Sequence, residues 1–145
     1  MPDGAHATAE ALHDREVPPQ GLANFERNLE SIVALSRAHG ARVALVTQGL
    51  DRGDLYVYRS RFAQMRAVDL MTAILKRVAG EKKAALIDAA SVLDGEAERQ
   101  REEGRTDEGP GNDSIFTNDV HLTDEGADLL AREVARGLLE QSCLP

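Results

Sequence analysis

One short segment of the chain carries residue types suited to acid–base chemistry. It reads Asn118-Asp119-Val120-His121 and comes directly before a predicted final helix. An imidazole titrates near neutral pH, so it can take up and return a proton. Such a base needs an oxygen acceptor to fix its tautomer and a hydroxyl or thiol to activate. The pattern by itself is also compatible with a structural histidine.

The other residues that could do chemistry have weaker settings. His6 and His13 lie near the N-terminus without a third ligand, and a metal site that joins His121 to Asp119 or Asp113 has no recognised ligand spacing. The sequence has no Gly-rich phosphate loop after a strand. The sequence therefore predicts no metal and no cofactor.

Composition limits the class of protein. The chain has 145 residues and a net charge of -8, with only 3% aromatic residues. This length fits one domain with an aliphatic core, and the acidic balance argues against nucleic-acid binding. We expect no transmembrane segment, no signal peptide and no internal disulfide for the single Cys143, so a soluble cytoplasmic location is the default expectation.

The elements that must position His121 alternate between two periodicities. Apolar residues at helical spacing are separated by short, continuous apolar runs. The predicted helices cover residues 22–39, 59–79 and 124–139, and the predicted strands cover residues 41–48 and 84–88. We expect Gly40 and Gly80 to end the first two helices, and Thr123 or Asp124 to cap the last. This order predicts an α/β fold with a parallel sheet covered by helices.

Two polar stretches complete the predicted domain organisation. Residues 1–20 are expected to form a flexible arm, and residues 94–113 a charged loop within the α/β domain of residues 21–145. Asp88 follows the second strand, where it either caps the next turn or lies at the functional edge of the sheet. Two strands are too few for a parallel sheet, so a strand has been missed or the chain is incomplete.

The segment around His121 resembles a known motif. Phe116-Thr117-Asn118-Asp119-Val120-His121-Leu122-Thr123-Asp124-Glu125-Gly126, followed by Leu129-Leu130-Ala131, is similar to the last motif of SGNH (GDSL-type) hydrolases. Phe25, Asn28-Leu29 and Val43 to Gln48 resemble the helix and strand that precede it. The resemblance covers about residues 22–139 without the 94–113 stretch. It implies the C-terminal part of a flavodoxin-like three-layer α/β/α fold that lacks its N-terminal strands.

The resemblance also implies roles for individual residues. His121 matches the catalytic base of these esterases and lipases, while Asn118 stands where they have the orienting aspartate. In a serine-protease triad that change costs about 10⁴ in turnover; Asp119 is the alternative orienting group. The Gly-Asp-Ser nucleophile motif is absent from the sequence, and Gly111-Asn112-Asp113 follows Pro110 where the oxyanion motif needs glycine.

Two functions follow as expectations. The first is hydrolysis of a small-molecule or lipid acyl ester, with His121 as general base and little activity in this chain by itself. In that case Met1 is an internal residue of a longer reading frame. The second is a non-catalytic module that completes its sheet with a partner chain or by self-association.

Overall fold

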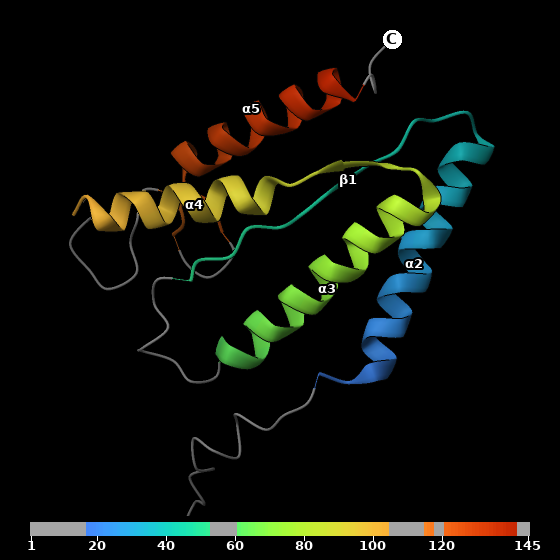
Figure 1. Cartoon of the computed structure of the whole chain (residues 1–145), viewed down its shortest axis with the longest axis horizontal. Coiled ribbons are helices and arrows are strands. Elements are labelled where there is room, and N and C mark those ends of the chain that lie inside the picture. The colour runs from blue at the N-terminus through green and yellow to red at the C-terminus, as the bar shows by residue number, and fades with distance from the viewer. Residues whose placement is uncertain (1–16, 53–60, 105–114, 118–120, 142–145) are drawn as a thin grey trace, which may run out of the picture.

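The fold is mixed α/β and mostly helical. A computed structural model describes residues 17–52, 61–104, 115–117 and 121–141, and the side chains of residues 61–64 are not described (Figure 1). The helices are α2 (Pro19–Ala38), α3 (Arg61–Lys82), α4 (Ala89–Glu102) and α5 (Asp124–Glu140), and the strands are β1 (Ala44–Val46) and β2 (Ala85–Ile87). Among the described residues no helix is long and apolar enough to cross a membrane.

The two strands pair in parallel, as predicted. Leu45 lies opposite Leu86, and the ladder continues on both sides with Ala85 N–H donating to the Val43 carbonyl and Thr47 N–H donating to the Ile87 carbonyl, each at 3.0 Å. Each strand is three residues long, shorter than the apolar runs that predicted it. The sheet is narrow and depends on its helices for cover.

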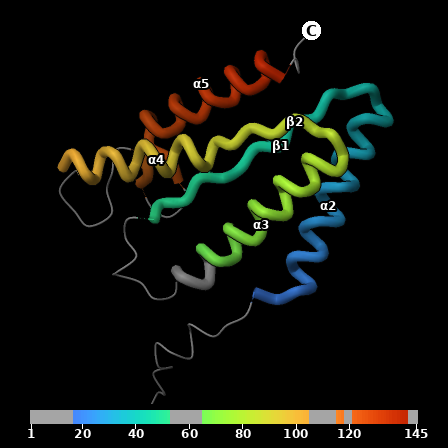
Figure 2. The backbone as a smooth tube through the Cα atoms, in the orientation of Figure 1, coloured from blue at the N-terminus to red at the C-terminus, as the bar shows by residue number. Residues whose placement is uncertain are grey.

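Helices α2 and α3 lie together on one side of the strands (Figures 1 and 2). The buried core on this side joins Val33, Leu45 and Val78, the last fully inaccessible to solvent. Two ion pairs link the helices outside this core, Glu26 to Arg77 and Glu30 to Lys82, each at 2.7 Å. Helix α2 contacts α3 more extensively than it contacts the strands. Surface ion pairs of this kind add little to that packing.

Helices α4 and α5 form the second packed group. Leu93 and Ala97 of α4 bury against Ile115 and Phe116, with Leu122, Leu129 and Leu130 packed around them. Helix α5 approaches β2 through Gly137, where an added Cβ would lie 2.7 Å from Ile87 Cγ1. The glycine thus permits the contact between this helix and the second strand.

Each strand is entered through the same helix-ending turn. At Gly40 (φ 75°) the Ala41 N–H donates to the Ser36 carbonyl at 2.9 Å, and at Lys83 (φ 53°) the Ala84 N–H donates to the Ala79 carbonyl at 2.9 Å. This is the Schellman arrangement, which needs a left-handed residue. Gly40 ends its helix as predicted. The prediction for Gly80 is wrong, because α3 continues to Lys82.

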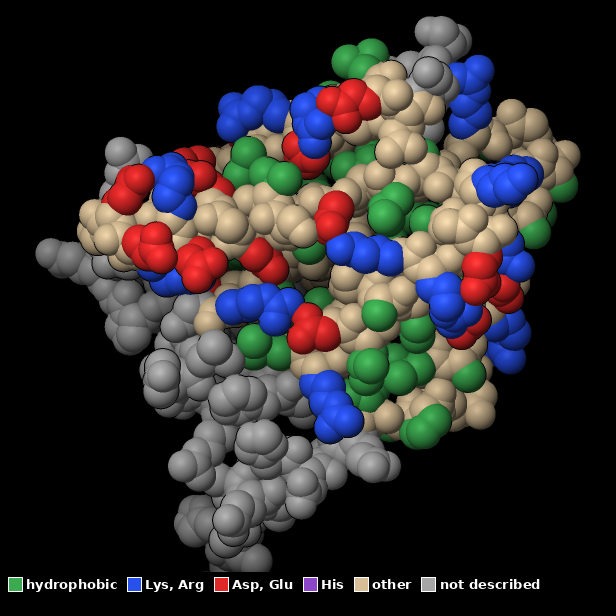
Figure 3. Space-filling view, in the orientation of Figure 1, with side chains coloured by type: hydrophobic (Ala, Val, Ile, Leu, Met, Phe, Trp, Pro, Cys, Tyr) green, Lys and Arg blue, Asp and Glu red, His purple; other side chains and the backbone are tan. Residues whose placement is uncertain are grey.

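A second correction concerns the predicted charged loop at 94–113. Residues 94–102 are the larger part of α4, and residues 105–113 lie outside the described residues. The helix is held by an inward stripe of Ala89, Leu93, Ala97 and Gln100. Charges at helical spacing cover its exposed side, including the Arg99 pairs with Glu96 and Glu103 (Figure 3). These i, i+3 and i, i+4 pairs favour helix over loop.

The predicted N-terminal arm falls largely outside the described residues. Helix α2 begins at Pro19, just inside the predicted arm, with proline in its first turn. Proline is well suited there because its missing N–H would have no helical partner. The prediction for residues 1–16 stays a prediction.

Candidate functional site

The His121 segment is held by a short bridged turn. Phe116 and Leu122 form an antiparallel bridge, and the Thr117 N–H donates to the His121 carbonyl at 2.8 Å. On the other side of the bridge the Thr123 N–H donates to the Ile115 carbonyl at 2.9 Å. The turn fixes the backbone of His121, whose side chain is exposed.

The turn leads directly into α5. Thr123 is the N-cap, and its hydroxyl accepts a hydrogen bond from the Gly126 N–H at 3.1 Å, which confirms the predicted cap. Gly126 is itself buried, and a Cβ there would lie 2.2 Å from the Ile115 carbonyl oxygen. Asp124 and Glu125 in the first turn favour the positive end of the helix dipole.

The turn lies beside the carboxyl end of β1. A Cβ added to Gly49 would lie 3.2 Å from Phe116 Cζ. Leu122, next to His121, lines a cleft of about 250 Å³ together with Val46, Gly49 and other residues that follow or face β1. In open parallel sheets ligands bind outside the carboxyl ends of the strands. His121 is therefore adjacent to Leu122, which lies near the carboxyl end of β1.

A polar cluster ties the carboxyl ends of both strands together. The buried Thr47 hydroxyl donates to Asp88 Oδ1 and accepts from the Ala90 N–H, both at 2.9 Å. Lys76 Nζ donates to Asp88 Oδ2 at 2.6 Å. Burial raises the pKa of Asp88, but hydrogen bonds from Lys76, Thr47 and Ser91 outweigh it and hold the pKa below its ordinary value.

The prediction that Asp88 caps the next turn is correct for the position of the residue but not for its hydrogen bonding. Asp88 occupies the N-cap of α4, yet its carboxylate makes no capping bond to that helix. Thr47, the residue directly after β1, supplies the missing acceptor to Ala90. The start of α4 is thus capped by a residue that follows β1, which the local sequence does not reveal.

A second network of hydrogen bonds and ion pairs involves the residues that come after β1. It was not predicted from the sequence. Asp94 accepts from the Leu50 N–H at 2.9 Å and from Arg52 Nε at 3.2 Å, and Arg52 Nη2 reaches Asp69 at 2.6 Å. Burial raises the pKa of Asp94 despite these bonds. Asp51, with a side chain only 1% exposed, pairs with Arg101 at 3.1 Å. The helical spacing of Leu93 and Ala97 is a local signal for α4, but no local pattern reports the partners of Asp94.

The structure brings only part of the predicted site into view. His121 is described, whereas Asn118, Asp119 and Asp113 lie outside the described residues, as do Tyr56 and Tyr58. Within the described part of the chain no group of three His, Cys, Asp or Glu residues is placed to hold a metal ion.

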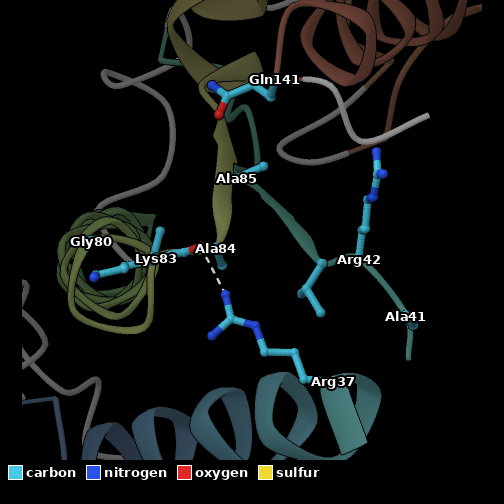
Figure 4. Close-up of a pocket in the computed structure, with 10 residues that line it drawn as sticks. Arg37, Ala41, Arg42, Gly80, Lys83, Ala84, Ala85 and Gln141 are labelled. Carbon is cyan, nitrogen blue, oxygen red and sulfur yellow. Dashed lines mark hydrogen bonds between the residues drawn. The ribbon is translucent and has the colours of Figure 1, made fainter. Parts of the chain in front are cut away.

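A further hollow lies at the opposite end of the sheet. Arg37, Arg42 and Lys83 line a pocket of about 470 Å³, together with Ala85 and Gln141 (Figure 4). Arg37 Nη2 donates to the Lys83 carbonyl at 2.8 Å. Helices α2 and α3 both end here, and cations stabilise helix C-termini. The helix C-termini therefore account for the basic side chains around this pocket, and no bound ligand is needed to explain them.

The described hydroxyls near the turn are already bonded. The Thr47 hydroxyl donates to Asp88 and accepts from the Ala90 N–H. The Thr117 hydroxyl donates to the His121 carbonyl at 3.2 Å. The arrangement offers an exposed imidazole beside a mainly apolar cleft.

Comparison with known proteins does not assign the chain. No family model matches it, and a search of the curated proteins finds no match.

Proposed function

We propose that this chain forms the base-bearing part of an ester hydrolase of the SGNH type, with His121 as the general base. The observation that carries the proposal is the position of the His121 turn, beside the carboxyl end of β1 and next to the cleft. The aliphatic side chains of Val46, Leu93 and Leu130 in that cleft suit the acyl part of an ester substrate. Helices on both sides of a parallel sheet are compatible with the proposed flavodoxin-like three-layer fold.

In the proposed reaction a serine hydroxyl from outside the described residues attacks the ester carbonyl. His121 accepts the hydroxyl proton and passes it to the leaving alcohol, which gives an acyl-serine. His121 then takes a proton from water, which attacks the acyl group, releases the carboxylic acid and restores the serine. N–H donors stabilise the oxyanion. Asn118 or Asp119 orients the imidazole, the former through an amide oxygen.

The test compares chain 1–145 with the product of the full open reading frame, using p-nitrophenyl butyrate. We expect turnover only from the longer product, because chain 1–145 has no Gly-Asp-Ser motif. His121→Ala should lower kcat/KM by at least about 10³-fold. The matched control is His39→Ala, since His39 is exposed at the end of α2 that leads into the amino end of β1.

Three results would contradict the proposal. The first is equal activity in native protein and His121→Ala, and the second is no turnover from the longer product. The third is a reading frame that begins at Met1 and encodes an inactive chain. If Asn118 is the orienting group, Asn118→Asp should raise kcat, whereas Asp119→Asn should lower kcat if Asp119 has that role.

A second candidate function is a non-catalytic module completed by a partner. It is favoured by the outer side of β1, along which no strand lies among the described residues.

A further inference from the structure

The segment that follows β1 is held by charged side chains from two helices. Asp94 of α4 accepts a hydrogen bond from the Leu50 N–H at 2.9 Å and another from Arg52 Nε at 3.2 Å. Arg52 Nη2 pairs with Asp69 of α3 at 2.6 Å. Because α3 packs with α2 and α4 packs with α5, Arg52 joins two helices that belong to different packed groups.

The geometry of this network favours a single arrangement of the segment. Arg52 uses Nε for one carboxylate and Nη2 for the other, so its planar guanidinium fixes the two partners relative to each other. Asp94 is only 22% exposed and also holds a backbone N–H. The neighbouring Asp51 pairs with Arg101 of α4 at 3.1 Å. Residues 50–52 are thus tied to α4 by several directional contacts.

The residue before this segment touches the base of the His121 turn. A Cβ added to Gly49 would lie 3.2 Å from Phe116 Cζ, so the Gly49 backbone lies against the Phe116 ring with little room for a side chain. Phe116 is buried, and it forms the antiparallel bridge with Leu122. A shift of the segment would therefore change the support of the ring from which the turn starts.

Apolar packing also holds the turn, but in a different way. Ile115 and Phe116 bury against Leu93 and Ala97 of α4. Apolar burial has no preferred direction, whereas charge-assisted hydrogen bonds and guanidinium–carboxylate pairs do. The polar network therefore fixes where Gly49 lies against the ring, which burial alone does not determine.

We propose that Arg52 is a positioning residue for His121. Arg52 acts through Asp94 on the backbone of residues 49–50. That backbone holds Phe116, and Phe116 holds the turn at the carboxyl end of β1. The role of Arg52 in a reaction rests on the proposed hydrolase function, since only then does the position of the imidazole set a rate. The hold on the turn itself can be measured without any activity.

The first experiment is amide hydrogen exchange in chain 1–145 with Arg52→Met, which removes the guanidinium and keeps an unbranched side chain. It is read at Thr117 and Thr123, whose N–H groups close the two sides of the turn. We expect both amides to exchange at least about tenfold faster, while the Ala85 amide in the sheet is unchanged. A general loss of stability would speed exchange at all three amides.

The matched control is Arg77→Met. The Arg77 side chain is 45% exposed, against 38% for Arg52, and it also pairs with two carboxylates, Glu26 of α2 and Glu81 of α3. This control should leave both turn amides unchanged. Arg52→Lys should exchange at a rate between native and Arg52→Met, because an ammonium keeps the charge but lacks the fixed fork that spans both carboxylates.

The second experiment measures turnover of p-nitrophenyl butyrate by the product of the full open reading frame, at a temperature where both variants are folded by circular dichroism. We expect Arg52→Met to lower kcat at least about tenfold and to change KM by less, since a misplaced base slows the chemical step. Arg77→Met should keep both constants.

Three results would overturn the proposal. They are unchanged turn amides in Arg52→Met, faster exchange that extends equally to Ala85 or to the Arg77→Met control, and an active longer product whose kcat does not respond to Arg52→Met. A longer product that is inactive without any substitution would instead contradict the hydrolase function. In that case the two turn amides still decide whether Arg52 positions the turn.

Discussion

The two outer sides of the sheet differ in how their backbone groups are satisfied. Beside β2 the side chain of Gln141 bonds the Leu86 carbonyl, and α5 closes on Ile87 through Gly137. Beside β1 no described element replaces these contacts, and α2 extends beyond the strand with Ile32 exposed.

This difference shows which outer edge of the sheet is covered by described residues. A parallel sheet is stable when both faces and both edges are covered. Among the described residues the β2 side meets this condition, whereas no described element covers the outer edge of β1. The His121 turn lies next to β1, so the proposed base is close to the uncovered outer edge of this strand.

The largest expected effect on stability comes from disturbing the contact between α5 and β2. Gly137→Val places a branched side chain against Ile87, and we expect it to lower the free energy of unfolding by about 2–3 kcal/mol. Urea denaturation measures the change. The control is Gly95→Ala, where nothing lies within 4 Å of the added Cβ and helix propensity predicts a gain of up to about 1 kcal/mol. A cost below about 0.5 kcal/mol at position 137 would mean that α5 does not pack here.

The entries to the two strands give the next effect. Gly40 and Lys83 hold the same left-handed position, one ahead of β1 and one ahead of β2. A Cβ is unfavourable in that conformation by about 1–2 kcal/mol. Gly40→Ala should therefore destabilise the chain by about 1 kcal/mol, and Lys83→Gly should stabilise it by a similar amount. Changes of the same sign in thermal or urea unfolding would contradict the assigned turns.

The sequence predicts this fold where a local rule decides it. The two apolar runs predict both strands, and Gly40 and Thr123 predict a helix end and a helix start. Helix α4 was missed because Leu93 is the only strongly apolar residue of its buried stripe, and the other members are Ala and Gln, which carry a weak hydrophobic signal. The Thr47 cap on Ala90 joins residues far apart in sequence, so no local pattern reports it.

The site follows the same division. The Thr123 cap could be predicted from a short motif, because the turn before α5 and the start of that helix are local. The networks of Asp88 and Asp94 could not, since their partners come from the segment that follows β1 and from α3. The position of the turn beside β1 likewise depends on packing between Phe116 and Gly49.

A smaller effect is the opposite pH dependence of the stability contributed by Asp88 and by Asp94. The pKa of Asp88 is lowered in the fold, so its contribution to stability is full above the ordinary value of 3.8 and is lost as pH falls through the folded pKa. Asp94 has the opposite sign: its pKa is raised by burial, so protonation on acidification favours the folded chain.

NMR titration of the carboxyl groups measures both values directly. We expect Asp88 to titrate below 3.8 and Asp94 above it. Lys76→Met should raise the pKa of Asp88 and leave that of Asp94 unchanged, because Lys76 bonds only the former of these two groups. The reverse order of the two pKa values would show that one of the networks is wrong.

The most direct test of the difference between the two edges is amide hydrogen exchange in the free chain, read residue by residue along β1. The Thr47 amide donates to Ile87, whereas those of Ala44 and Val46 point away from β2. We predict that Ala44 and Val46 exchange at least about a hundredfold faster than Leu45 and Thr47. Equal protection of all four amides in a monomer would contradict the open edge and show that β1 is already paired on both sides.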